Sequence, residues 1–164
     1  MISKKVCMLG GFSVGKTSLV ERYVNSLFSD KYLSTVGVKI SKKTLSLDGA
    51  EITLVLWDME GKDVYTNVNL SYLRGAMGFF VVADGTRKET LEMAVSLRKS
   101  AMEISGGIPS CLLVNKADIR EQWEITDAML DPLAETGLTV LHTSAKTGEG
   151  VEEAFSILTK AMLG

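Results

Sequence analysis

The sequence predicts an α/β fold in which helices cover both faces of a mostly parallel sheet. Strand-like apolar runs alternate along the chain with segments whose apolar residues recur at helical spacing. The run at 51–57 has apolar residues at odd and even positions alike, as expected of a strand buried on both faces. One antiparallel pair is also expected, because Asp48-Gly49 is a strong hairpin turn between the runs at 38–47 and 51–57.

The other strands follow in order along the chain. The first is expected at about 4–9, and a helix then runs from 15 to about 25. After the hairpin, the apolar runs at 78–83, 111–114 and 138–141 predict buried strands.

Helices are expected between and after these later strands. Thr86-Arg87-Lys88-Glu89 has the form of a capping box, which predicts that Thr86 caps the helix that follows. Pro132, with Asp131 as its cap, predicts the start of a shortened helix. The apolar residues over 151–162 recur at helical spacing and predict the last helix.

Composition indicates a small intracellular protein. The chain has 164 residues, 46% of them hydrophobic, so we expect a single domain over 1–164. A net charge of −2 without a basic stripe argues against a nucleic-acid partner. Cys7 and Cys111 lie in apolar runs without metal-ligand spacing, and we expect buried free thiols in a reducing compartment.

The sequence also bears on membranes and location. It has neither the long apolar stretch of a membrane span nor the opening pattern of a signal peptide. Residues 159–164 contain no cysteine that could be prenylated, so no direct lipid anchor is expected. A cytoplasmic monomer is expected, and any recruitment to a membrane would go through a protein partner.

Residues 10–17 read Gly-Gly-Phe-Ser-Val-Gly-Lys-Thr, a G-x-x-x-x-G-K-T motif between the first strand and a helix. This pattern is typical of a phosphate-binding loop, because glycines let backbone N–H groups converge on phosphate oxygens. Lys16 adds a positive charge, and the Thr17 hydroxyl can bind Mg²⁺. The nucleotide contacts predicted here are Gly11, Phe12, Ser13, Val14, Gly15, Lys16, Thr17 and Ser18.

Further loops follow predicted strands, at the edge of the sheet where such folds bind ligands. In Asp58-Met59-Glu60-Gly61, Asp58 can support Mg²⁺ through water and Gly61 can approach a terminal phosphate. In Asn115-Lys116-Ala117-Asp118, the carboxylate can accept two hydrogen bonds from guanine while the lysine stem covers the base. Adenine lacks that pair of donors, so Asp118 favours GTP over ATP.

A last loop reads Thr143-Ser144-Ala145-Lys146. One of its backbone N–H groups can reach the guanine carbonyl, and Lys146 can pack on the other side of the ring. With this loop, the motifs G-x-x-x-x-G-K-T, D-x-x-G, N-K-x-D and S-A-K resemble the small Ras-like GTPases. The resemblance is closest to the Rab branch, through residues 34–38 and 72–79.

The resemblance implies a P-loop NTPase fold with a six-stranded sheet, one antiparallel pair and about five flanking helices. It implies a switch that binds GDP or GTP with Mg²⁺. Phe28 would lie against guanine, and Tyr32 would also contact the nucleotide. Thr35 would join Thr17 as a Mg²⁺ ligand, with Asp58 supporting the metal through water.

The same resemblance implies how the switch works. The N–H groups of Thr35 and Gly61 would hold the γ-phosphate. Loss of that phosphate would release residues 29–38 and 59–73, the segments through which effector and regulatory proteins would bind.

Three residues depart from the family pattern. Lys62 stands where a glutamine usually orients the attacking water, and a lysine ammonium offers no acceptor for a hydrogen bond from water. Glu60 replaces an alanine and brings a negative charge toward the phosphates. Phe12 places a bulky ring where an activator's arginine enters. The residues predicted to act in catalysis are Lys16, Thr35, Gly61 and Lys62.

Three functional classes remain open at this point. The leading one is a switch that hydrolyses GTP, slowly or by an unorthodox route. The second is a GTP-binding scaffold with negligible turnover, favoured by the three departures. A P-loop kinase or ATPase is disfavoured, because N-K-x-D has no use in adenine binding.

Two aromatic residues outside the motifs receive structural interpretations. His142 is expected to be packed or hydrogen-bonded rather than catalytic. Trp123 is interpreted as a half-exposed packing residue or a partner contact.

Overall fold

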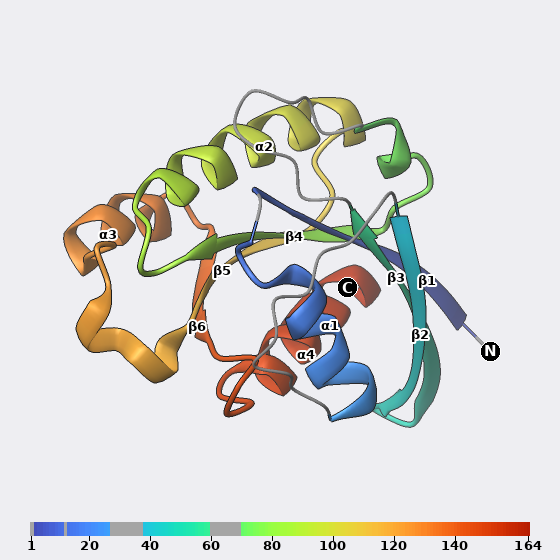
Figure 1. Cartoon of the computed structure of the whole chain (residues 1–164). Helices are drawn as coiled ribbons and strands as arrows, with labels where there is room; N and C mark the ends of the chain where they lie inside the picture. Colours follow the sequence, from blue (N-terminus) through green and yellow to red (C-terminus); the bar gives the residue numbers. More distant parts are fainter. Residues whose placement is uncertain (1, 12, 27–37, 60–69) are drawn as a thin grey trace.

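The computed structural model describes residues 2–11, 13–26, 38–59 and 70–164. These residues form one six-stranded sheet in the order β2-β3-β1-β4-β5-β6 (Figure 1). The strands are β1 (Ile2–Gly10), β2 (Val38–Leu47), β3 (Ala50–Met59), β4 (Gly78–Asp84), β5 (Ser110–Asn115) and β6 (Thr139–Thr143). The described helices are α1 (Lys16–Asn25), α2 (Glu89–Ser105), α3 (Asp127–Glu135) and α4 (Val151–Leu163), with the 3₁₀-helices η1 (Leu70–Leu73) and η2 (Ala117–Gln122). The predicted fold class is confirmed.

Helices cover both faces of the sheet, and a separate hydrophobic core lies between the sheet and the helices on each face. In the central strand β1, Val6 and Met8 pack in the core under α1 and α4. The alternate residues, Cys7 and Leu9, pack on the other side, where α2 and α3 contribute. Because successive side chains of a strand point to opposite faces, a strand between two helical layers is apolar at every position.

The sheet is parallel except for one hairpin. Strand β2 pairs antiparallel with β3, and β1, β4, β5 and β6 continue from β3 in parallel pairs. At the hairpin turn, Asp48 has φ 51° and Gly49 has φ 81°, the left-handed conformations that a two-residue turn between twisted strands requires. The predicted Asp48-Gly49 hairpin is confirmed.

The register brings the carboxyl ends of four strands to one edge. Gly10 pairs with Val82, two residues before the end of β4. Asp84 at that end is level with Asn115 of β5, which is level with Thr143 of β6. The loops singled out from the sequence therefore begin side by side.

Two helix predictions were wrong. Thr86 does not cap α2, which begins at Glu89, because its hydroxyl and its N–H both bind the Asp84 carboxylate, at 2.7 and 2.9 Å. Pro132 does not begin a helix but lies inside α3, which starts at Asp127. The hydrogen bond that proline removes would have gone to the carbonyl of Ala128, an exposed residue at which water can substitute.

Strand ends differ from the sequence expectations by at most two residues, mostly because the polar residues that extend a strand give no apolar signal. The expectation that the two cysteines are buried free thiols is confirmed. Cys7 and Cys111 are buried and free, and burial raises the pKa of each to about 11. No helix in the described part of the chain is long and apolar enough to cross a membrane.

Candidate functional site

The phosphate-loop motif forms the connection between β1 and α1. Ser13 and Gly15 have left-handed backbone conformations, with φ 60° and 99°. A Cβ atom on Gly10 would lie 2.8 Å from the carbonyl oxygen of Val82 on β4, so the loop needs glycine for close packing as well as for curvature. Val14 is buried, and Ser18 lies in the first turn of α1.

The Lys16 ammonium is held inside this loop. Its Nζ donates to the carbonyl oxygens of Gly10 at 3.3 Å and Gly11 at 3.1 Å. Burial lowers the pKa of Lys16 to about 8, although the charge of Asp58 acts to raise it. A bound polyphosphate would strongly favour the charged form, so this position suits a cation that pairs with phosphate.

The side chains of Thr17 in α1 and Asp58 in β3 are in direct contact. The Thr17 hydroxyl donates to Asp58 Oδ2 at 2.5 Å, and Asp58 is fully buried near the end of β3. A hydroxyl and a carboxylate oxygen are donors that Mg²⁺ accepts. Among the described residues, no three or more His, Cys, Asp and Glu side chains form a group that could hold a metal ion.

Asn115 joins three of the predicted loops. Its Nδ2 donates to the carbonyl of Val14 at 3.1 Å, and its Oδ1 accepts from the Thr143 hydroxyl at 3.2 Å. A Cβ atom on Gly15 would lie 2.2 Å from Asn115 Nδ2. The phosphate loop and the N-K-x-D loop are thus fitted against one another at a position that only glycine permits.

The loops after β5 and β6 are also tied together. Ser144 Oγ donates to Asp118 Oδ1 at 2.8 Å. Arg22 of α1 donates from Nε to the carbonyl of Ala145 at 2.7 Å and from Nη2 to the carbonyl of Lys146. The structure therefore brings the N-K-x-D and S-A-K motifs together, as expected, and adds Arg22, which the sequence analysis missed.

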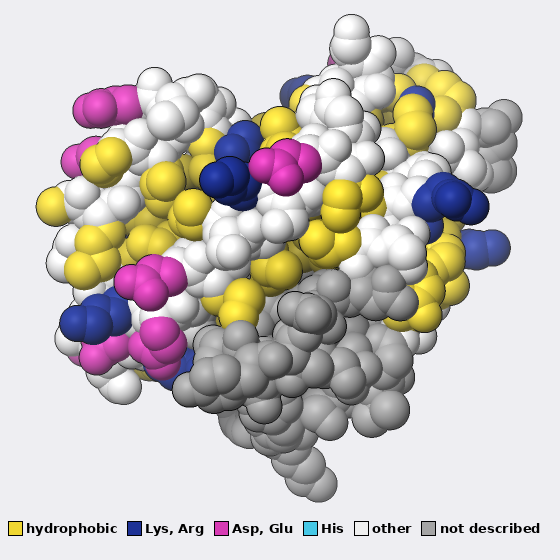
Figure 2. Space-filling view, turned by 90° about the horizontal axis from the view of Figure 1, so that it is seen from above, with side chains coloured by type: hydrophobic (Ala, Val, Ile, Leu, Met, Phe, Trp, Pro, Cys, Tyr) yellow, Lys and Arg dark blue, Asp and Glu magenta, His cyan; other side chains and the backbone are white. Residues whose placement is uncertain are grey.

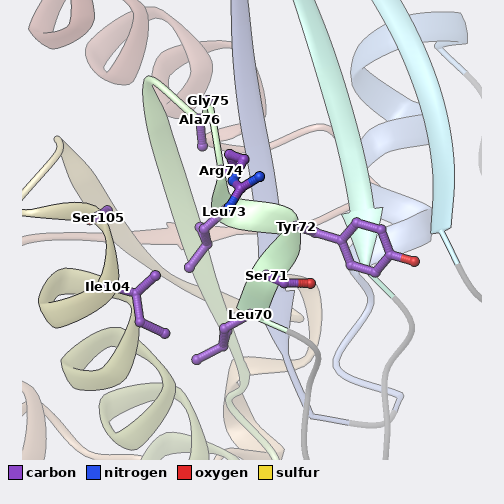
Figure 3. Close-up of a pocket in the computed structure, with 9 residues that line it drawn as sticks. All are labelled: Leu70, Ser71, Tyr72, Leu73, Arg74, Gly75, Ala76, Ile104 and Ser105. Atoms are coloured by element: carbon purple, nitrogen blue, oxygen red, sulfur yellow. The ribbon is translucent and has the colours of Figure 1, made fainter.

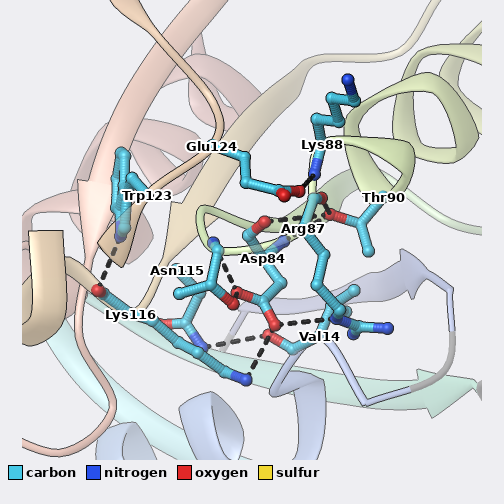
Figure 4. A network of polar contacts seen from close by, with 10 residues as sticks. Val14, Asp84, Arg87, Lys88, Thr90, Asn115, Lys116, Trp123 and Glu124 are labelled. Carbon is cyan, nitrogen blue, oxygen red and sulfur yellow. Dashed lines mark hydrogen bonds and ion pairs between the residues drawn. The ribbon is translucent and has the colours of Figure 1, made fainter. Parts of the chain in front are cut away.

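A second missed residue is Asp84, at the end of β4 (Figure 4). Its buried carboxylate accepts hydrogen bonds from Lys116 Nζ at 2.7 Å and from Arg87 Nε at 3.0 Å. Burial by itself would raise the pKa of Asp84, but the hydrogen bonds from Lys116, Thr86 and Arg87 hold it below its usual value.

Trp123 fixes the backbone of the same loop. Its Nε1 donates to the carbonyl of Lys116 at 2.8 Å, and the side chain is partly buried. Trp123 also lies edge-on to His142, whose Nδ1 is 2.9 Å from Arg120 Nη1. Burial and the charge of Arg120 lower the pKa of His142. His142 is thus packed and hydrogen-bonded, as expected.

Replacing Gly85 with alanine should destabilise the protein through Trp123. The new Cβ would lie 2.1 to 2.5 Å from three atoms of the indole, which cannot move without losing its bond to Lys116. We expect the free energy of unfolding, measured by urea denaturation, to fall by about 1–3 kcal/mol. In a Trp123→Ala background the same substitution should have little further effect, and equal losses in both backgrounds would contradict the argument.

Several predicted site residues lie outside the described part of the chain. They are Phe12, Phe28, Tyr32, Thr35, Glu60, Gly61 and Lys62. Of the two expected partner segments, the structure describes residue 38 of 29–38, and residues 59 and 70–73 of 59–73.

A surface hollow of about 730 Å³ adjoins the second segment, between η1 and the end of α2 (Figure 3). Leu70, Leu73 and Ile104 face one another there, while Tyr72 points away, toward Trp57 of β3 at 5.8 Å between ring centroids. Ile104 is 58% exposed and Tyr72 is 37% exposed. Seen from the α2 side, the surface has hydrophobic side chains with Lys, Arg, Asp and Glu side chains scattered among them (Figure 2).

Comparison with known proteins decides the family. The family model for the Ras family matches residues 5–164. The chain belongs to the Ras family. It is 35% identical to Ras-related protein Rab-13 of Bos taurus over 161 residues, which cover 97% of this chain and 79% of that protein.

Other relatives give the same picture. Ras-related protein Rab-4 of Dictyostelium discoideum is 34% identical and Ras-related protein Rab-8B of Homo sapiens 31% identical, each over 97% of this chain and 78% of the relative. The Ras family member described here thus belongs with the Rab branch, and it is a small GTP-binding switch protein. Proteins of this family bind GDP and GTP with Mg²⁺ and interact with effectors and regulators. The glycine-lined loop, Lys16 and the Thr17–Asp58 pair fit that nucleotide and metal.

Proposed function

We propose that the edge formed by β1, β4, β5 and β6 binds Mg²⁺·GTP and GDP in the following way. Residues 11–18 surround the phosphates, with the Lys16 ammonium against them and the Thr17 hydroxyl on the metal. Asp58 supports the metal through water. The observation that carries this proposal is the bond from Asn115 Nδ2 to the Val14 carbonyl, because it seats the phosphate loop beside the base-specific motif.

The base lies between two loops in this proposal. Asp118 accepts hydrogen bonds from guanine, oriented by the hydroxyl of Ser144, and Lys116 covers the ring. A backbone N–H of Ala145 faces the guanine carbonyl, with Lys146 on the far side of the base. The nucleotide that copurifies tests this directly, because an adenine nucleotide would contradict a guanine site.

Phe28, Tyr32, Thr35 and Gly61 complete the proposed site. Phe28 lies against guanine, and Tyr32 and Thr35 close over the phosphates. Thr35 also binds Mg²⁺, and the N–H groups of Thr35 and Gly61 hold the γ-phosphate. Their release after hydrolysis would change the surfaces at 29–38 and 59–73, which we propose as the effector and regulator surfaces of a single unit over 1–164. A cytoplasmic monomer, recruited to membranes by a protein partner, stays a prediction.

Hydrolysis is proposed to be slow. Members of this family are GTPases in general, and Mg²⁺ supplies charge neutralisation at the phosphates. Lys62, however, cannot accept a hydrogen bond from the attacking water, and Glu60 adds negative charge near the γ-phosphate. Phe12 narrows the approach of an activator's arginine.

Lys62→Gln should therefore accelerate intrinsic hydrolysis, by about tenfold or more, because an amide oxygen restores water positioning. Single-turnover hydrolysis of preloaded GTP with Mg²⁺ measures this rate. GDP affinity is the control and should stay unchanged, since the substituted side chain acts on the water. Equal rates in the two proteins would show that Lys62 does not limit hydrolysis.

A second candidate function is a GTP-binding interaction protein without turnover. The same three departures, Phe12, Glu60 and Lys62, favour it. The two candidates differ in the nucleotide that copurifies: GDP indicates a protein that hydrolyses GTP, and retained GTP indicates one that does not.

A further inference from the structure

Asp84 binds four donors with one buried carboxylate (Figure 4). Its Oδ2 accepts from Lys116 Nζ at 2.7 Å and Arg87 Nε at 3.0 Å, and its Oδ1 accepts from the N–H and hydroxyl of Thr86. The Asp84 side chain is 0% exposed, whereas those of Lys116 and Arg87 are 37% and 36% exposed. The pairing therefore fixes two surface cations to an immobile point at the end of β4.

Such a buried charge is weak as a stabiliser of the fold. Taking a carboxylate out of water is expensive, and an ion pair recovers that cost only in part. Its clearest effect is on geometry, because a lysine side chain has many rotamers and loses them when its ammonium is held. In this chain the side chain so fixed is Lys116, which belongs to the N-K-x-D motif.

Lys116 is held at its other end as well. Its backbone has φ 76°, a left-handed conformation uncommon for lysine, and its carbonyl accepts the Trp123 indole N–H at 2.8 Å. The aliphatic stem is thus stretched between a fixed carbonyl and a fixed ammonium. Asp84 is level with Asn115 in the β4–β5 pairing, so the carboxylate lies at the floor of the same loop.

We propose that Asp84 is a positioning residue, which holds the Lys116 side chain in the extended form that covers guanine and thereby slows nucleotide release. This rests on the proposed placement of Lys116 over the base. Asp84 itself does not contact the nucleotide in this proposal. Its contribution is preorganisation: the stem is ordered before the base arrives, so binding does not have to order it.

The test is the rate at which fluorescently labelled GDP leaves the protein in excess unlabelled GDP and Mg²⁺. Asp84→Asn keeps the size of the side chain and its acceptor for Thr86, but it removes the charge that holds Lys116. We expect release to be about tenfold faster, equivalent to roughly 1.4 kcal/mol. Arg87→Gln is the matched control, since it removes the other cation on Asp84 and leaves Lys116 paired; its release rate should stay within about threefold of the wild type.

A double-mutant cycle separates positioning from a general loosening of the loop. If Asp84 acts through Lys116, then Asp84→Asn should add nothing to the release rate of Lys116→Ala. A double variant that is faster than Lys116→Ala by the full factor of Asp84→Asn would overturn the proposal. Fast release by Lys116→Ala with wild-type release by Asp84→Asn would also overturn it, but would leave the proposed base site standing.

Two further results complete the design. Wild-type release by Lys116→Ala would contradict the placement of Lys116 over the base, and with it the role of Asp84. If Asp84→Asn does not fold, Lys116→Met tests the same ion pair by changing the lysine, because methionine keeps an aliphatic stem but lacks the ammonium. Release as slow as in the wild type from that variant would show that the ion pair is dispensable.

Discussion

Asp118→Asn is expected to reverse the base preference from guanine to xanthine. In the proposed site the Asp118 carboxylate offers acceptors to the guanine N1–H and exocyclic amine, whereas an asparagine offers one acceptor and one NH₂ donor. That donor would face the amine of guanine, but it would pair with the carbonyl that xanthine has in the same place. With about 1.5–3 kcal/mol for each bond to a charged group, we expect guanine affinity to fall by about a hundredfold or more.

Competition between GDP and xanthosine diphosphate for a labelled nucleotide measures this preference. The local structure should survive the change, because an asparagine can keep the bond to Ser144 Oγ that Asp118 Oδ1 now makes at 2.8 Å. Thermal unfolding with saturating xanthosine diphosphate provides that control. If the folded variant retained the preference for guanine, Asp118 would not be the residue that determines base specificity.

Asn115→Ala is expected to have the second large effect, on stability and binding together. The substitution leaves the Val14 carbonyl without this donor and the Thr143 hydroxyl without this acceptor, at three fully or nearly fully buried residues. At about 1–3 kcal/mol for each of these two unsatisfied buried groups, the free energy of unfolding should fall by about 2–6 kcal/mol. GDP release should accelerate as well, because the substitution removes the hydrogen bond that joins the N-K-x-D loop to the phosphate loop.

Urea denaturation and labelled-GDP release measure the two effects. Asn25→Ala is the matched control: it removes the same side chain at an exposed position, where Asn25 Nδ2 donates to the Glu21 carboxylate at 3.1 Å. Its effect on stability should stay within about 0.5 kcal/mol. If Asn115→Ala lost stability but released GDP at the wild-type rate, Asn115 would be a structural residue only.

Apolar patterning explains how much of the fold could be predicted. The hairpin at Asp48-Gly49 and the central strands were predictable because turn chemistry and two-sided burial both leave local patterns. The capping box predicted at Thr86 was wrong, because the Thr86 hydroxyl donates to the nearby Asp84 carboxylate instead. That competition follows from burial, which a four-residue pattern does not contain.

The residues of the candidate site likewise fall into those that sequence patterns identify and those that they do not. Asn115 and Asp118 belong to a motif with fixed spacing, so they could be predicted and placed near one another. Asp84 was missed although it directly follows an apolar run, a position that the sheet topology marks as part of the site. Arg22 had no such signal, because its partners are backbone carbonyls after β6, which have the same chemistry at every residue.

The contacts that complete the site join parts of the chain that are synthesised far apart in time. Asn115 lies 101 residues after Val14, and Ala145 lies 123 residues after Arg22. Long loops close at a cost in chain entropy, and the contacts that offset it form only once the later strands are in the sheet. On the ribosome, the phosphate loop emerges first but stays unfinished until the loop at Ala145 has followed it. Nucleotide binding by a nascent chain would therefore report that synthesis has passed the loop at Ala145.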